Sequence, residues 1–414
     1  MLSEREIPFS SSGLPSEIFR HLNDLSISEK RTNMLRKSTL CAAAALALVS
    51  LFGTAAAADL QIYGRVDGGL IYHNYGGDSE KSDTFTMDSG TNTATRVGIQ
   101  GSEALTESTK AIFRLENRFT SDTGAFNAYA GKTNRLFGGQ STFGLVNRDW
   151  GEITFGRVAG ISSSTGPYDL QAYMDPFGGG TNGTGNAPVK SSRHDNMITY
   201  RSPVIGGVQA TLQHSLKSDS NDEGEEGKSD VNRFYDAGLH YAAGSLHVAA
   251  VYERLEWGSA KQLDNGASED REVATLGGSY RFEPVTVFLQ TQYFKGLNAV
   301  DGFSSANLSE TKNTRDGEIE GYGLYAGAEF WFGPSSWKWM AYWRDYELER
   351  KTGASYDGNT FGIANKFIYR PSKTVEFYVG AGYSEWDRLA SKAGAVETLT
   401  DSDLNGYFGM TKYF

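Results

Sequence analysis

The stretch LQIYGRVDGGLIYH, residues 60–73, alternates apolar and polar side chains with a period of two. One parity carries Leu60, Ile62, Val66, Leu70 and Tyr72, and the other carries Gln61, Tyr63, Arg65, Asp67 and His73. Successive side chains of a β-strand point to opposite faces. The stretch therefore predicts a strand with one apolar face and one polar face.

The same alternation breaks off and restarts up to residue 414. It predicts strands near 60–72, 94–102, 109–119, 135–147, 151–158, 195–202, 208–216, 232–241, 245–256, 270–282, 285–295, 318–332, 336–348, 358–370, 374–386 and 402–414. Short breaks (EALTES, RDW, PVIG, AAG, EP, GPS, PSK) alternate with long ones near 73–93, 120–134, 159–194, 217–231, 257–269, 296–317, 349–357 and 387–401. This rhythm predicts an all-β fold, a 16-stranded antiparallel transmembrane β-barrel with short periplasmic turns and long extracellular loops.

The composition agrees with a barrel whose lumen is wet. The hydrophobic fraction is 39% and the mean hydropathy is −0.43, as expected when lipid-facing residues are diluted by polar residues of the opposite parity. The parity rule has two exceptions, Asn365 and Lys412, which fall among lipid-facing residues. Lys412 can reach the headgroups, whereas nothing in the sequence accounts for Asn365. The formal net charge of −11 argues against nucleic acid as a partner.

The N-terminal region predicts an exported protein. Residues 34–58, MLRKSTLCAAAALALVSLFGTAAAA, have a basic start, an apolar centre and an Ala-x-Ala end, which is typical of a secretory signal peptide. A short membrane anchor is the alternative. Residues 1–33 are interpreted as an upstream extension outside the fold, and residues 59–414 as the barrel. Cys41, the sole cysteine, lies in the signal segment, so the mature barrel suits an oxidising compartment.

The longest connection inside the barrel, Ala159–Arg193, is rich in glycine and carries Asp169 and Asp175. A loop of this length is usually functional or disordered. We expect it to fold into the barrel and narrow the pore; the alternative is an exposed surface loop. Six arginines have inward parity or flank this loop: Arg65, Arg96, Arg114, Arg118, Arg157 and Arg201. Facing the loop acids, they would select permeants by charge, unless they are scattered in the lumen without a shared plane.

Several short motifs resemble those of general-diffusion porins of Gram-negative bacteria, above all the betaproteobacterial branch. The motifs are IYGRVDGGL, TRVGIQGSEAL, KAIFRLENRF, TFGR, ITYRSPVIGG and the terminal Phe414. The resemblance implies an outer-membrane location and an eyelet wall formed by Arg65, Arg96, Arg157 and Arg201. The family's loop motif Pro-Glu-Phe-Gly-Gly is present with acid and proline transposed, at residues 175–179. The resemblance also implies a homotrimer in which the second loop latches a neighbour.

The expected function is passive diffusion of ions and small hydrophilic solutes, with a weak anion preference. Outer-membrane lipid and lipopolysaccharide are the expected surroundings, and no cofactor is expected. A substrate-specific channel for sugars or dicarboxylates is the alternative, for which Tyr325, Tyr342, Tyr346 and Tyr378 are inward candidates. An outer-membrane enzyme is disfavoured because no nucleophile motif is present.

One acidic stretch, Asp219–Asp230, has a partial calcium-loop pattern. Asp219, Asn221, Glu223 and Gly224 have the required spacing, but Asp230 stands where a glutamate is usual. Helices should flank such a loop and strands are predicted here. We therefore favour a solvated acidic loop, bridged to lipopolysaccharide by divalent cations, over a specific calcium site.

Overall fold

The computed structural model describes residues 59–126, 135–177, 188–220, 223–259, 269–298, 307–308, 317–350, 355–392 and 395–414. The predicted extension (1–33) and signal segment (34–58) lie outside these residues. Residues 56–414 form one compact unit. Among the described residues, no helix has the length and apolar character needed to cross a membrane.

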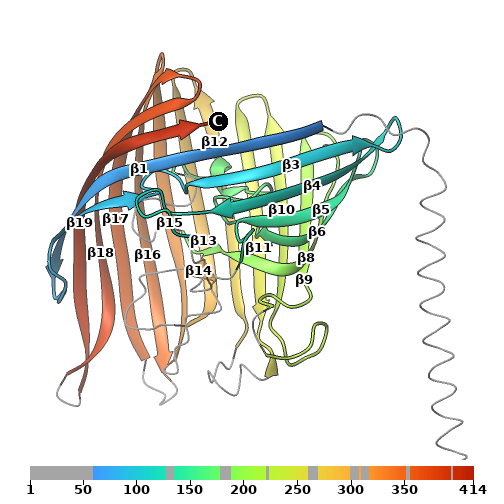
Figure 1. Ribbon diagram of the computed structural model, residues 1–414. Helices are drawn as coiled ribbons and strands as arrows, with labels where there is room; N and C mark the ends of the chain where they lie inside the picture. The colour runs from blue at the N-terminus through green and yellow to red at the C-terminus, as the bar shows by residue number, and fades with distance from the viewer. Residues whose placement is uncertain are drawn as a thin grey trace, which may run out of the picture. The chain divides into compact units, whose positions relative to one another are not determined.

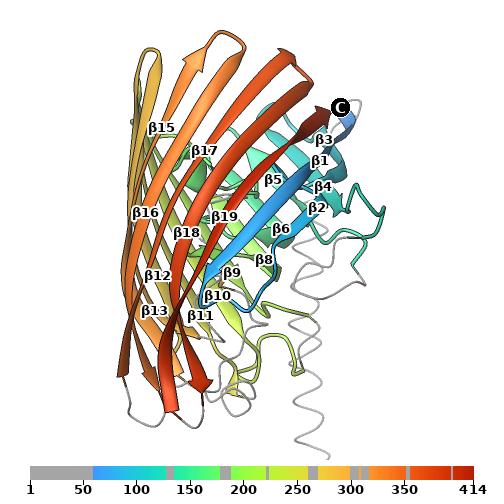
Figure 2. The same ribbon diagram turned by 90° about the vertical axis from the view of Figure 1, so that its left-hand side faces the viewer.

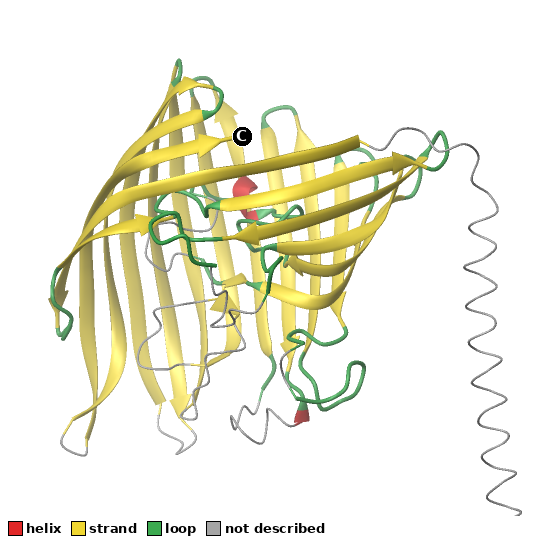
Figure 3. Ribbon diagram, viewed as in Figure 1, coloured by secondary structure: helices red, strands yellow, loops and turns green. Residues whose placement is uncertain are grey.

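In the described part of the chain, sixteen antiparallel strands form a closed wall (Figures 1 and 3). They are β1 (Asp59–Gly77), β3 (Arg96–Ala104), β4 (Thr109–Arg118), β5 (Gln140–Asn147), β6 (Gly151–Ala159), β8 (Arg193–Arg201), β9 (Val208–Ser215), β10 (Arg233–Ala243), β11 (Leu246–Glu256), β12 (Arg271–Phe282), β13 (Val285–Asn298), β15 (Gly317–Phe332), β16 (Ser335–Arg350), β17 (Ser355–Ser372), β18 (Val375–Lys392) and β19 (Ala395–Tyr413). The predicted fold class is confirmed.

The wall closes between the first and the last strand. β1 pairs with β19 from Arg65 opposite Tyr413 to Gly77 opposite Asp401. The Gly64 N–H donates to the Phe414 carbonyl at 3.0 Å, and the Phe414 N–H donates back at 3.1 Å. A closed ring leaves no unpaired strand edge for lipid to cover.

The short connections are tight turns built from residues that suit them. At the turn between β10 and β11, Gly244 has a φ of 60°, a left-handed conformation that glycine adopts without a steric penalty. Trp331, Phe332, Trp337 and Trp339 gather at the turn between β15 and β16, where an aromatic girdle is expected.

The parity prediction agrees with the exposure of the side chains. Leu289 and Leu324 are 66% and 50% exposed on the outside, whereas Gln290 and Arg344 are buried inside. Asn365 lies opposite Trp339 across the strand pair. The indole N–H of Trp337 makes a long contact of 3.5 Å to its Oδ1, so this amide has a polar partner on the apolar face.

Four strand boundaries differ from the prediction by five residues or more, and one of them is the end of β1 at Gly77 instead of near residue 72. β5 begins at Gln140 rather than near residue 135, because Arg135 turns away to bind two aspartates. β18 and β19 continue to Lys392 and from Ala395. Their ends carry polar residues of both parities, so the ladder extends beyond the region where apolar alternation signals a strand. The later strands are accordingly long and lie side by side in Figure 2.

Three strands of the described residues were not predicted: β2 in the wall, and the two-residue strands β7 and β14 given below. β2 (Thr84–Ser89) pairs with residues 68–73 of β1, while β3 pairs with residues 59–65 of the same strand. Between them the chain turns inward, where the Asn92 N–H donates to the Asp67 carboxylate at 3.0 Å. Two further short elements are the 3-10 helix η2 (Gln171–Tyr173) and the parallel pair β7 (Lys190–Ser191) with β14 (Asn307–Leu308).

Candidate pore constriction

The connection between β6 and β8, residues 160–192, is called L3 here. Its described part lies inside the wall, where η2 is enclosed by strands (Figure 3). Ile161, Leu170, Met174 and Val189 of L3 are buried in one cluster with inward side chains of the wall. The wall side chains include Phe234, Val251, Val273, Phe294, Ile319 and Leu348, from β10 to β16. The prediction that this loop folds into the barrel therefore agrees with its described residues.

Two carboxylates of the wall hold the start of L3. Asp236 accepts the Ile161 N–H at 2.6 Å, and Glu253 accepts the Ser162 hydroxyl at 2.7 Å. These two acids lie directly opposite each other on β10 and β11. On the other arm of L3, the side chain of Gln292 both donates to and accepts from the backbone of Val189, at 2.8 and 2.9 Å.

Two lysines of the wall hold the region around Phe177. Lys338 donates to the Pro176 carbonyl at 2.7 Å, and the Lys366 ammonium lies 5.0 Å from the Phe177 ring centroid. Lys366 also donates to Asn92 at 2.8 Å. L3 is therefore fixed along β10 to β17 by apolar packing and by polar contacts.

The arginines occupy the wall formed by the earlier strands, in three groups. In the first group, Glu116 of β4 accepts from Arg96 at 3.1 Å and from Arg118 at 3.0 Å. Arg65 lies near the same cluster and donates to the Ala94 carbonyl at 3.1 Å. The structure thus brings three of the predicted arginines together around one carboxylate.

The second group surrounds a cavity of about 290 Å³ next to L3. Arg201 forms an ion pair with Glu152 at 2.6 Å, and its guanidinium lies 5.1 Å from the Tyr168 ring centroid. Arg114 donates to the Tyr63 hydroxyl at 2.9 Å. The remaining polar lining is mostly neutral, with Gln61, Gln100, Gln140, Thr142 and Thr154.

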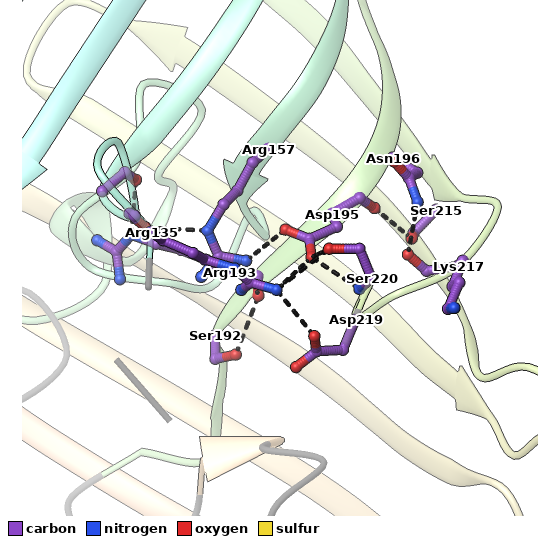
Figure 4. A network of polar contacts seen from close by, with 12 residues as sticks. Arg135, Arg157, Ser192, Arg193, Asp195, Asn196, Ser215, Lys217, Asp219 and Ser220 are labelled. Carbon is purple, nitrogen blue, oxygen red and sulfur yellow. Dashed lines mark hydrogen bonds and ion pairs between the residues drawn. The ribbon is translucent and has the colours of Figure 1, made fainter. Parts of the chain in front are cut away.

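In the third group, Arg157 lies in a network of polar contacts with Asp195 and Arg135 (Figure 4). Arg157 forms an ion pair with Asp195 at 2.7 Å and donates to the Gly138 carbonyl at 3.0 Å. Arg135 binds Asp195 at 2.5 Å and Asp219 at 2.8 Å. These contacts join the loops after β4 and β9 to β8, so Arg157 acts here as a structural tie.

The two loop acids bind L3 itself. Asp175 is buried, accepting the Phe177 N–H at 2.6 Å and the Gln171 side-chain amide at 3.0 Å. Asp169 accepts the Gln171 N–H at 2.7 Å. Burial, aided by the charge of Asp175, raises the pKa of the Asp169 carboxyl to about 7. Burial also lowers the pKa of the nearby Lys190 ammonium.

Two residues of the arginine wall were missed from the sequence. Glu116 has the same parity as Arg114 and Arg118, so the alternation alone could have placed it inside. Arg193 donates to the Gly139 carbonyl at 2.8 Å and to the Thr165 hydroxyl at 2.6 Å. Since Arg118 and Arg201 also contact L3 carbonyls, at Thr165 and Pro167, the arginine wall touches the first part of the loop.

The inward tyrosines do not present an open aromatic row. Tyr325, Tyr342, Tyr346 and Tyr378 are each less than 9% exposed. Tyr325 and Tyr342 stack at 6.1 Å and are covered by Phe177 of L3. Tyr325 and Tyr342 therefore pack against L3 and do not offer an open surface to solutes.

The acidic stretch after β9 is tied into the same loop network. Asp219 is paired with Arg135, whereas Asn221 lies outside the described residues. Across the described ranges, no group of three or more His, Cys, Asp or Glu side chains is placed to hold a metal ion.

Comparisons with known proteins agree on one family. Residues 42–389 match the family model described as Gram-negative porin. A relative from Bordetella pertussis, an outer membrane porin protein, is 32% identical over 61% of this chain and 68% of its own length. The solved anion-selective porin from Comamonas acidovorans has 20% identity and a TM-score of 0.61, covering 86% of this chain and all of that one. OmpT of Vibrio cholerae in a trimer form has 14% identity and a TM-score of 0.54, over 87% and 100% of the two chains.

Proposed function

Because the chain belongs to the family of Gram-negative porins of the outer membrane, we propose that its pore admits ions and small hydrophilic solutes passively and favours anions. Members of this family are channels and not enzymes. The placement of the arginines supports this charge preference.

One observation carries the charge preference. Arg96 and Arg118 share Glu116, Arg201 is paired with Glu152, and Arg157 is paired with Asp195. Among the described residues, no carboxylate forms an ion pair with Arg65 or Arg114. Asp169 and Asp175 bind the backbone and amides of L3. Arg65 and Arg114 are therefore two guanidinium groups of the lumen wall without a carboxylate ion-pair partner among the described residues, and such groups attract anions.

The solved relative from Comamonas is described as anion-selective, which is the preference proposed here. A channel specific for one solute is not favoured, because the four inward tyrosines are covered. We also propose a homotrimer, in keeping with the trimer form of OmpT. The exposed apolar side chains of the early strands, among them Leu60, Ile62 and Phe143, offer surface for both lipid and a neighbouring copy.

The test is the reversal potential of the refolded barrel in planar bilayers under a salt gradient. The native protein should show an anion preference. The double variant Arg65→Gln/Arg114→Gln should shift the potential toward cations, while Arg148→Gln, in the exposed turn between β5 and β6, should leave it unchanged. A cation-selective native channel, or an unchanged double variant, would overturn the charge assignment; absence of conductance would overturn the channel itself.

A further inference from the structure

The short connection between β2 and β3, residues 90–95, lies inside the wall and is called the inner turn here. Thr91, Asn92 and Thr95 are buried, whereas Thr93 and Ala94 are half-buried. The inner turn contacts inward-pointing side chains of β1, β3, β17 and β19, namely Arg65, Asp67, Arg96, Lys366 and Thr411. Its packed side therefore faces the wall, and its open side faces the lumen.

Asp67 of β1 holds the inner turn with its backbone and with its side chain. β3 pairs with residues 59–65 of β1 and β2 pairs with residues 68–73, so neither of these described strands pairs with the backbone of Asp67. The Thr95 hydroxyl accepts the Asp67 N–H at 3.0 Å. The Gly90 N–H donates to the Asp67 carbonyl at 3.2 Å, and the Asn92 N–H donates to the carboxylate at 3.0 Å. Because buried backbone groups need partners, the inner turn is a fixed part of this side of the barrel.

The inner turn also binds two arginines of the first group. The Ala94 carbonyl accepts from Nε of Arg65 at 3.1 Å and from Nε of Arg96 at 3.4 Å. A carbonyl oxygen has two lone pairs and can accept from both donors. A single peptide group of the turn therefore orients both guanidinium groups.

Asn92 connects the inner turn to L3. Its Oδ1 accepts from the Lys366 ammonium at 2.8 Å, and its Nδ2 donates to the Thr411 hydroxyl at 3.2 Å. The same ammonium lies 5.0 Å from the ring centroid of Phe177 in L3, which is within the range of a cation–π contact. The inner turn thus contacts the arginine wall directly and L3 through Lys366.

We propose that the inner turn is a second loop of the constriction, which fixes Arg65, Arg96 and Lys366 and sets the width of the pore together with L3. It binds these cations through neutral oxygen atoms, so it places them without cancelling their charge. This inference rests on the proposed channel function and adds to it the segment that positions the cations.

Chemical labelling of a single cysteine tests where the inner turn lies. Cys41 is the only cysteine of the sequence, so residues 59–414 offer no competing thiol. In Thr93→Cys, a methanethiosulfonate reagent should reach the thiol and lower the single-channel conductance, because the added group occupies the lumen. A reducing agent should then restore the conductance.

The matched control for the labelling is Ser82→Cys. Ser82 is exposed between β1 and β2, outside the inner turn, so its labelling should leave the conductance unchanged. Mass spectrometry follows the labelling of both variants. If Thr93→Cys is not labelled, or if it is labelled and conducts as before, the inner turn is not part of the constriction.

A neutral substitution tests whether the inner turn positions the cations. Asn92→Ala removes the acceptor of Lys366 and the donor to Thr411 without changing the charge. Its conductance should rise and its anion preference should fall, because a loosened turn widens the pore and anions pass farther from the guanidinium groups. Thr93→Ala, the control, leaves the Asn92 amide and the Ala94 carbonyl in place and should keep both native values. Native conductance and native reversal potential in Asn92→Ala would overturn the positioning role.

These outcomes differ from a failure of the proposed function. A native barrel that does not conduct would overturn the channel and this inference with it. A native channel that prefers cations would overturn the charge assignment alone, because the effect of labelling Thr93→Cys on conductance does not depend on the sign of the permeant. A conducting native barrel with an unaffected Thr93→Cys variant would overturn only the role of the inner turn.

Discussion

Gly64 lies where β1 passes the last residue of the chain, and a side chain has no room there. A Cβ atom at Gly64 would lie 2.4 Å from the Phe414 ring and 2.6 Å from the Arg96 carbonyl oxygen. We expect Gly64→Ala to weaken the closure between β1 and β19, at a cost of about 1–3 kcal/mol, as for overpacked sites. The measurement is the temperature at which the folded barrel loses its compact migration in gel electrophoresis.

The matched control for this change is Gly406→Ala on β19. A Cβ atom at Gly406 meets no atom within 4 Å, so this variant should unfold at the native temperature. Equal unfolding temperatures for Gly64→Ala and Gly406→Ala would show that close packing of Gly64 against Phe414 does not limit the stability of the β1–β19 pairing.

The raised pKa of Asp169 predicts that the barrel becomes less stable as pH rises. A salt-bridged carboxylate, whose pKa is lowered, has the opposite effect. The pKa of Asp169 is about 7 in the folded barrel and 3.8 as a free side chain. Between these values the folded state binds more protons than the unfolded state, so the free energy of unfolding falls as pH rises through this window. Asp169→Asn still accepts the Gln171 N–H but does not titrate. Its unfolding temperature should therefore exceed that of the native protein more at pH 8 than at pH 5.

Glu107→Gln, in the exposed turn between β3 and β4, is the control for this experiment. It changes the net charge by the same amount without touching L3, and should give no such difference. If the difference in unfolding temperature between Asp169→Asn and the native protein were the same at pH 5 and at pH 8, the raised pKa of Asp169 would be contradicted.

At the scale of elements, L3 is held by apolar packing as well as by hydrogen bonds. Ile161 is fully buried between the wall and the loop. Truncating a buried isoleucine to alanine typically costs about 2–5 kcal/mol. We expect Ile161→Ala to loosen L3 and to raise the current noise of the open channel. Ser164→Ala, at a half-buried position of the same loop, should leave the noise unchanged.

The predictability of the elements depended on how each is stabilised. β10 to β17 could be placed from alternation, because lipid on one side and a packed lumen on the other impose a period of two. β2 could not, because its pairing with β1 is set by the inward turn at Asn92 rather than by burial of one face. The ends of β18 and β19 were missed for a related reason: outside the bilayer, backbone pairing continues without an apolar face.

The site was predictable in its residue types but less so in its partners. Parity placed Arg65, Arg96 and Arg118 on the inside, and they do lie together. It could not foresee that Arg157 is tied to Asp195, because the two residues meet at a register shift between the paired strands β6 and β8, which the alternation does not reveal. Nor could it foresee that Asp169 and Asp175 bind L3, since the hydrogen bonds of a loop follow its own turns and leave no period in the sequence.

At the scale of the whole molecule, the proposed positive charge of the lumen and the negative total charge of −11 oppose each other. The charges beside L3 act on a permeant at close range, so they are screened less than charges elsewhere on the barrel. The screening length is about 10 Å at 0.1 M salt and about 3 Å at 1 M. We expect the anion preference to weaken as salt rises, without changing sign, when reversal potentials are measured at a fixed gradient in dilute and in concentrated salt. A preference that reverses to cations in dilute salt would mean that the acidic exterior dominates.

The pairing of β1 with β19 has a consequence for how the chain can be cut and rejoined. The ring of backbone hydrogen bonds runs through the seam without a gap, so the ends of the polypeptide interrupt the covalent chain and not the sheet. Phe414 meets β1 at Gly64, five residues inside Asp59, a span of about 16 Å at strand rise. In a chain that starts at Asp59, as the predicted cleavage after residue 58 would leave it, a linker of that reach would yield a circular permutant opened at the turn between β5 and β6, with every strand keeping its neighbours. Strand order around the ring, and not the point where synthesis starts, is what defines this barrel.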